Sequence, residues 1–138
     1  MSRREGREEA LRLLYLKDLC CSTLDEAESI VWGKCGGEGD DEFKRPPSVV
    51  EFARQIASGV SDNIGIIDGK IESLSENWSL ERMPVVDRNI LRIAVYEIVF
   101  TPSTPHNVVI NEAVELAKKF SGDKSKLFIN GILDRVKG

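Results

Sequence analysis

Apolar residues recur at gaps of three and four along nearly the whole chain, and they scarcely ever alternate strictly with polar ones. The most regular stretch is formed by Ala53, Ala57, Val60, Ile64, Ile67, Ile71 and Leu74. This spacing matches one face of an α-helix, which repeats every 3.6 residues, whereas a half-buried strand would repeat every two. The sequence therefore predicts an all-α protein.

Six main helices follow from this pattern. They are expected over about residues 6–20, from Thr23 to the glycines near residue 33, and over 48–74, 85–100, 108–120 and 124–136. Two of the starts carry the residues of a capping box, a hydroxyl followed three positions later by a glutamate: Thr23 with Glu26, and Ser48 with Glu51. Residues 33–47 are rich in glycine, charge and proline, which predicts a mobile loop.

Two helices have clear candidate core faces. In the first helix these are Ala10, Leu11, Leu14 and Tyr15, and in the last they are Ile129, Ile132, Leu133 and Val136. The long helix over 48–74 contains Gly59, Gly65 and Gly69, and each glycine costs about 1 kcal/mol relative to alanine in a helix interior. We therefore expect either close approach of a neighbouring helix at these glycines or a bend.

The composition is that of a folded protein without a basic surface overall. Of the 138 residues, 41% are hydrophobic and 30% charged, and the net charge is −4, so a site for a polyanion would have to be a local patch. The three cysteines lack C-x-x-C spacing, which favours a reducing compartment. We expect no secretory leader, no membrane contact and a cytoplasmic location.

Catalytic and metal-binding motifs are scarce. His106 is the only histidine, so a histidine cluster for a metal is impossible, and we expect this residue to lie in a solvated loop. The sequence contains neither G-x-x-x-x-G-K-[ST] nor G-x-G-x-x-G. Glu97 falls within the apolar stripe of its helix, where a carboxylate needs a hydrogen-bonding partner, and we interpret it as structural. We predict no enzyme activity, no metal and no cofactor.

Two groups of residues could bind RNA. Arg3, Arg4 and Arg7 stand where a helix begins, although the partial positive charge of a helix N-terminus disfavours cations there. Near the other end of the chain, Phe128 is expected at the edge of a buried stripe, with Lys124 and Lys126 close by. An aromatic ring flanked by cations suits the stacking of an unpaired base whose phosphate is held alongside.

Four segments in a fixed order add a family resemblance that covers nearly the whole chain apart from residues 33–47. They are "RREGREEALRLLY", "NWSLERMPVVDRNILRIAVYE", "INEAVELAKKF" and "KLFINGILD". Together they resemble the NusB family of transcription termination and antitermination factors. The resemblance implies one domain of two packed three-helix subdomains, over about residues 1–75 and 76–138.

The resemblance also implies a function and its partners. Such proteins bind the single-stranded boxA element of ribosomal RNA leader transcripts together with NusE, a small-subunit ribosomal protein. They help to assemble an antitermination complex on RNA polymerase, and a homodimer is possible in isolation.

Several residues match family positions. RNA contacts map onto Arg3, Arg4, Arg7, Tyr15 and Phe128, and partner contacts onto the acidic residues Glu81 and Asp87, which would complement a basic ribosomal protein. Glu5 interrupts the basic run that many relatives carry, which would weaken RNA binding or make it more dependent on the partner. Arg4 and Arg7 are each expected to contribute one phosphate contact and little to folding.

Two other functions stay open at this point. One is a helical protein-binding adaptor without RNA affinity, which the net acidity and Glu5 would suit. The other is a stand-alone RNA-targeting module, because NusB-like domains precede the catalytic domain of certain ribosomal RNA cytosine methyltransferases. The chain offers no candidate cofactor loop for methyl transfer.

Overall fold

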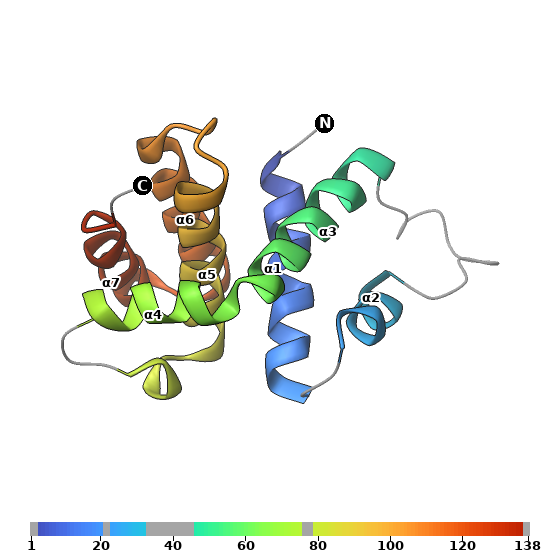
Figure 1. Ribbon diagram of the computed structural model, residues 1–138, viewed down its shortest axis with the longest axis horizontal. Coiled ribbons are helices and arrows are strands. Elements are labelled where there is room, and N and C mark those ends of the chain that lie inside the picture. Colours follow the sequence, from blue (N-terminus) through green and yellow to red (C-terminus); the bar gives the residue numbers. More distant parts are fainter. Residues whose placement is uncertain (1–2, 21–22, 33–45, 76–78, 137–138) are drawn as a thin grey trace. The chain divides into compact units, whose positions relative to one another are not determined.

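The computed structural model describes residues 3–20, 23–32, 46–75 and 79–136, and every regular element within these ranges is helical. In chain order they are α1 (Arg3–Cys20), α2 (Leu24–Trp32), α3 (Pro47–Asp62), α4 (Ile64–Leu74), the 3-10 helix η2 (Leu80–Arg82), α5 (Val85–Phe100), α6 (His106–Phe120) and α7 (Asp123–Leu133) (Figure 1). The predicted all-α fold class is confirmed. The loop predicted over residues 33–47 lies outside the described residues except for its last two.

The chain forms two compact units, Met1–Ser58 and Gly59–Gly138, which divide within α3. Helix α4 belongs to the second unit because it packs against α5 and η2. The subdomains expected over about 1–75 and 76–138 stay a prediction.

The first unit contains α1, α2 and most of α3. The α1 residues Ala10, Leu11, Leu13 and Leu14 are buried, while Tyr15 is only half-buried. The α2 spacing predicts an apolar face of Leu24, Ala27, Ile30 and Val31; Ala27 is buried and Leu24 and Val31 are half-buried, but Ile30 is 64% exposed, so the prediction is wrong for Ile30.

The start of α2 confirms Thr23 as the helix cap, which is one half of the first predicted capping box. The Glu26 amide donates to Thr23 Oγ1 at 3.2 Å, and the Thr23 hydroxyl lies 3.4 Å from Glu26 Oε1. This contact satisfies one of the amides that a helix start leaves without a partner.

The second predicted capping box is wrong. Helix α3 begins at Pro47, so Ser48 lies inside the first turn, and the Pro46 carbonyl accepts hydrogen bonds from the amides of Val49 and Val50 at 2.9 and 3.1 Å. Proline suits the first helical position because its φ is preset and its missing N–H would have had no intrahelical partner.

The single long helix predicted over 48–74 is also wrong, because Asn63 separates α3 from α4. Its backbone leaves the helical region, at φ −118° and ψ 24°. The Asn63 side-chain amide donates to the Gly59 carbonyl at 2.9 Å, and its backbone amide lies 3.2 Å from the same oxygen. Helix α3 thus ends at Asp62 and α4 begins at Ile64.

The three glycines of this segment have different environments. A Cβ at Gly59 would lie 2.3 Å from Cζ of Tyr96, so close helix approach explains this glycine as expected. A Cβ at Gly65 or Gly69 would meet nothing within 4 Å, and the expectation of close approach is wrong there.

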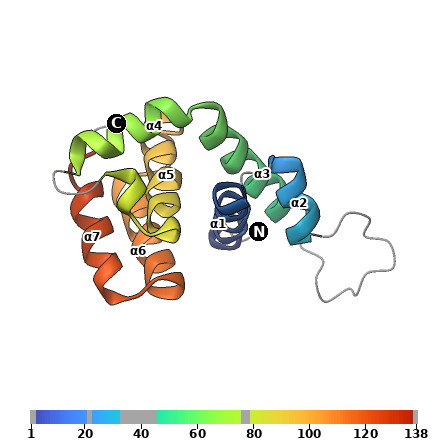
Figure 2. The ribbon, with the colours of Figure 1, turned by 90° about the horizontal axis from the view of Figure 1, so that it is seen from below.

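In the second unit, α5 packs against α4, α6 and α7, and α4 runs crosswise to it (Figure 2). The predicted bounds of α5 are confirmed, and its residues Ile90, Leu91, Ile93 and Val95 are almost fully buried. The predicted buried stripe of the last helix is confirmed too, although α7 ends at Leu133 and Val136 is buried beyond it.

Gly122 stops α6 as predicted. Both the Ser121 and the Gly122 amides donate to the Ala117 carbonyl, at 2.8 and 2.7 Å. The φ of Gly122 is +141°, a value that side-chain-bearing residues rarely adopt. The chain therefore turns sharply between α6 and α7.

Candidate functional site

The arginines of the first turn of α1 lie within the helix itself, which begins at Arg3 and not near residue 6 as predicted. The side chains of Arg3 and Arg4 are exposed. The Arg3 guanidinium carbon lies 5.2 Å from the centroid of the Phe52 ring, a cation–π distance. Phe52, on α3, thus gives an otherwise unfavourably placed cation a fixed contact.

Arg7 has a different environment from its two neighbours. It is 3% exposed, and its guanidinium carbon lies 5.7 Å from the same Phe52 ring. A Cβ at Gly6 would lie 2.4 Å from Cδ2 of Phe52, so the α1 backbone approaches this ring closely. Sequence analysis did not identify Phe52. Burial of Arg7 favours a packing role for it.

A second cluster in the first unit also connects residues that are distant in sequence. The buried Glu9 accepts a hydrogen bond from the Trp32 indole N–H at 2.9 Å and pairs with Arg12. Arg54 lies over the Trp32 ring at 5.6 Å and donates twice to Glu28 Oε1, at 3.0 and 2.8 Å. The bond to Glu28 raises the pKa of Arg54 above its ordinary value. These contacts join α2 to both α1 and α3.

A pocket of about 380 Å³ lies on the second unit. It is lined by Met83, Pro84, Asp87, Lys124, Ser125 and Phe128. Phe128 is half-buried, as its place at the edge of the stripe predicts, and Lys124 is exposed. The pocket therefore combines an apolar wall and an aromatic ring with one accessible cation.

Lys126 does not line this pocket. Its Nζ lies 3.9 Å from Oδ1 of Asp123, in an exposed pair that contributes little stability. It still adds positive charge to the first two turns of α7.

The two acidic residues assigned to partner binding differ in exposure. Glu81 lies exposed in η2. Asp87 is 3% exposed, and its Oδ1 and Oδ2 accept hydrogen bonds from the hydroxyls of Ser121 and Ser125 at 2.5 and 2.8 Å. Pro84, between the two acids, lines the pocket.

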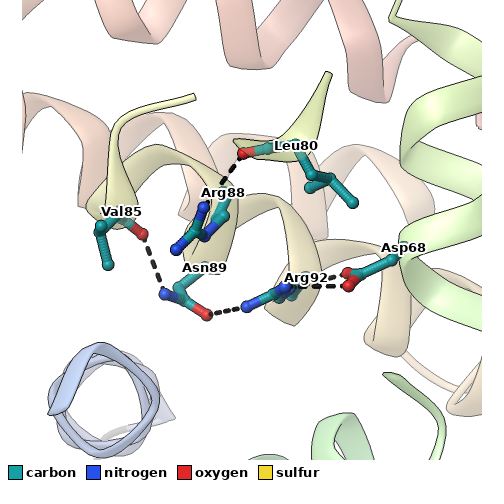
Figure 3. Close-up of polar contacts among 6 residues, drawn as sticks. All are labelled: Asp68, Leu80, Val85, Arg88, Asn89 and Arg92. Atoms are coloured by element: carbon teal, nitrogen blue, oxygen red, sulfur yellow. Dashed lines mark hydrogen bonds and ion pairs between the residues drawn. The ribbon is translucent and has the colours of Figure 1, made fainter. Parts of the chain in front are cut away.

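One polar contact joins η2 to α5, and others connect residues within α5 and join α5 to α4 (Figure 3). Arg88 donates to the Leu80 carbonyl at 3.1 Å, and the Asn89 side-chain amide donates to the Val85 carbonyl at 2.9 Å. Arg92 donates to Asn89 Oδ1 at 3.0 Å and makes two contacts with Asp68 of α4. The exposed Glu81 thus lies next to a residue whose carbonyl is held by Arg88 of α5.

His106 and Glu97 differ in exposure. His106 is exposed at the first position of α6, not in a loop as predicted, and its Nε2 lies 3.3 Å from the Leu133 carbonyl. Glu97 is buried as predicted. Within the described ranges, the structure contains no cluster of three or more metal-ligating side chains. None of the helices in those ranges is long and apolar enough to cross a membrane.

Comparison with known proteins places this fold in a family. The NusB family model matches residues 4–137. The transcription antitermination protein NusB of Myxococcus xanthus is 43% identical over 135 residues, which cover 98% of this chain and 94% of that protein.

Solved structures agree with the family match. A structure of T. maritima NusB is 34% identical, with a TM-score of 0.82, over 98% of this chain and 89% of that one. A crystal structure of the antitermination factors NusB and NusE in complex with double-stranded RNA contains a chain 29% identical, with a TM-score of 0.81, over 96% and 92% of the two chains. These matches place the chain in the class of all-helical transcription antitermination proteins. The chain belongs to the NusB family.

Proposed function

We propose that this protein is a non-enzymatic, cytoplasmic transcription antitermination factor that binds boxA-type single-stranded RNA of ribosomal RNA leader transcripts together with NusE. The observation that carries the proposal is the pocket at α7, where the half-buried Phe128 ring stands beside the exposed Lys124. Such a ring can stack on an unpaired base while the ammonium group meets its phosphate.

The other residues take roles that fit their exposure. Arg3 and Arg4, which are exposed, contact phosphates and gain affinity by releasing counterions. Arg7 and Tyr15 support the α1 surface from positions that are buried and half-buried. Lys126 adds positive potential near the pocket.

Binding of NusE involves the exposed Glu81, because an accessible carboxylate complements a basic ribosomal protein. Asp87 is buried, so its contribution to the partner surface is indirect. The complete assembly includes RNA polymerase.

Fluorescence anisotropy with a labelled boxA oligonucleotide, with and without NusE, tests the proposal. We expect the protein alone to bind boxA and to bind it more tightly with NusE. We expect weaker binding to a scrambled strand and to a boxA duplex. Absence of affinity in every mixture would instead favour a protein-binding adaptor, and preference for the duplex would contradict single-strand recognition.

A further inference from the structure

Three side chains meet where α5, α6 and α7 come together. Asp87 is the third residue of α5, Ser121 follows the last residue of α6, and Ser125 is the third residue of α7. Both serine hydroxyls contact the Asp87 carboxylate, and their oxygens lie 2.8 Å apart. A buried carboxylate needs such donors, because without them its burial would be costly.

The backbone of the first turn of α7 is weakly capped. Its N-cap is Gly122, which has no side chain to accept a hydrogen bond from the turn. The backbone bond from the Lys126 amide to the Gly122 carbonyl is long, at 3.3 Å. The bond from Ser125 to Asp87, at 2.8 Å, is a short polar contact that joins this turn to α5.

The same turn carries the pocket wall. Lys124 precedes Ser125 directly, and Phe128 follows it by three residues, so that Ser125 and Phe128 lie on adjoining turns of one helix face. Asp87 and Ser125 line the pocket alongside them. A shift of the first turn of α7 would move both Lys124 and Phe128 relative to Met83 and Pro84.

We infer that Asp87 is a positioning residue for RNA binding: it anchors the first turn of α7 through Ser125 and Ser121 and so sets the ring of Phe128 and the cation of Lys124 in the pocket. The part of this inference that concerns RNA rests on the proposed function. It assigns Asp87 to the shape of the pocket and not to a direct contact with the protein partner.

The test compares Asp87→Asn, Ser125→Ala, Ser121→Ala, the double variant Asp87→Asn/Ser125→Ala and the conservative Ser125→Thr. Asp68→Asn is the matched control, because it makes the same chemical change in an ion-paired carboxylate on α4. Two quantities are measured well below the unfolding temperature. They are boxA affinity, and hydrogen exchange of the Lys126 amide relative to amides in the middle of α5.

Asp87→Asn and Ser125→Ala are each expected to speed exchange at Lys126 without changing α5. If the binding-competent arrangement falls to about a tenth of the molecules, RNA affinity falls about tenfold. The double variant should bind RNA no more weakly than Asp87→Asn alone, because both single changes act on the same Ser125–Asp87 contact. Ser125→Thr keeps the hydroxyl, so it should show wild-type exchange at Lys126 and wild-type RNA affinity. Asp68→Asn should leave RNA affinity unchanged.

The inference is overturned if Ser125→Ala and Ser121→Ala both leave exchange and affinity at the wild-type values while Asp87→Asn weakens binding, since Asp87 would then act directly. Additive losses in the double variant would also overturn it. If the wild-type protein fails to bind boxA but exchange at Lys126 responds as expected, the anchoring role stands and the proposed RNA function fails.

Discussion

Asp68 and Arg92 form a two-point ion pair between α4 and α5, with Nε at 2.8 Å from Oδ1 and the second guanidinium nitrogen at 2.9 Å from Oδ2 (Figure 3). Only 13% of the Arg92 side chain and 23% of the Asp68 side chain are exposed. The planar guanidinium also donates to Asn89 Oδ1, so the Arg92 side chain makes three polar contacts.

Arg92→Lys is therefore expected to destabilise the protein although it keeps the charge. An ammonium group cannot reproduce the forked contact, and loss of one or two charged hydrogen bonds costs about 1–3 kcal/mol. Urea denaturation followed by circular dichroism measures the change. Arg82→Lys, at an exposed site in η2, is the control and should remain within about 0.5 kcal/mol of wild type. Equal effects of the two changes would contradict the role given to the fork.

Gly59→Ala should destabilise the second unit, because its Cβ would lie 2.3 Å from the Tyr96 ring. Overpacking of this kind costs about 1–3 kcal/mol. Gly69→Ala is the opposite case, since its Cβ would meet nothing within 4 Å and alanine favours a helix by about 1 kcal/mol. Thermal unfolding should show a lower Tm for the first variant and a higher Tm for the second. A rise in both would mean that Tyr96 moves aside at no cost.

Arg4→Ala and Arg7→Ala are expected to act differently, although the sequence alone predicts similar effects. The exposed Arg4 should lose one phosphate contact, which lowers the slope of log affinity against log salt by about 0.7 on a single strand. Folding should be unaffected. Arg7 is buried beside Phe52, so its truncation should destabilise the protein by about 1–3 kcal/mol.

Salt titrations of RNA binding and urea denaturation of both variants separate these effects. Lys17→Ala, towards the other end of α1, controls for loss of one charge from the same helix. A normal stability of Arg7→Ala would contradict the packing role given to this side chain.

Phe128→Ala should weaken RNA binding by about 1–3 kcal/mol, the usual contribution of one stacked base. Phe128→Tyr should retain most of the affinity, because the stacking face is preserved. Leu127→Ala is a neighbouring control, since Leu127 is 71% exposed and does not line the pocket. Anisotropy titration at one fixed salt concentration measures all three. Full affinity of Phe128→Ala would exclude stacking at this ring.

Features that depend on neighbouring residues were predicted well. The bounds of α5, the Thr23 cap, the Gly122 stop and the half-buried position of Phe128 follow from periodicity and local chemistry. The break at Asn63 was not predicted because the apolar spacing continues across it, from Val60 to Ile64.

Contacts between distant segments could not be predicted. Nothing near Arg7 indicates that a ring 45 residues further along will cover it. The same holds for Asp87, whose hydrogen-bond donors Ser121 and Ser125 come after α6 in the chain. It also holds for the contact between Arg54 and Glu28. Periodicity shows which face of a helix is buried, but the partner of a buried charge depends on how the helices pack.

The backbone of Gly122 restricts how this protein can diverge. Open space surrounds the position where a side chain would begin, so volume sets no limit, but the φ of +141° does. Saturation mutagenesis should find that few substitutions are tolerated at Gly122, whereas many are tolerated at the neighbouring, exposed Asp123. Among homologues, changes in charge and in length on either side of this residue then alter the start of α7, while the turn itself stays unchanged.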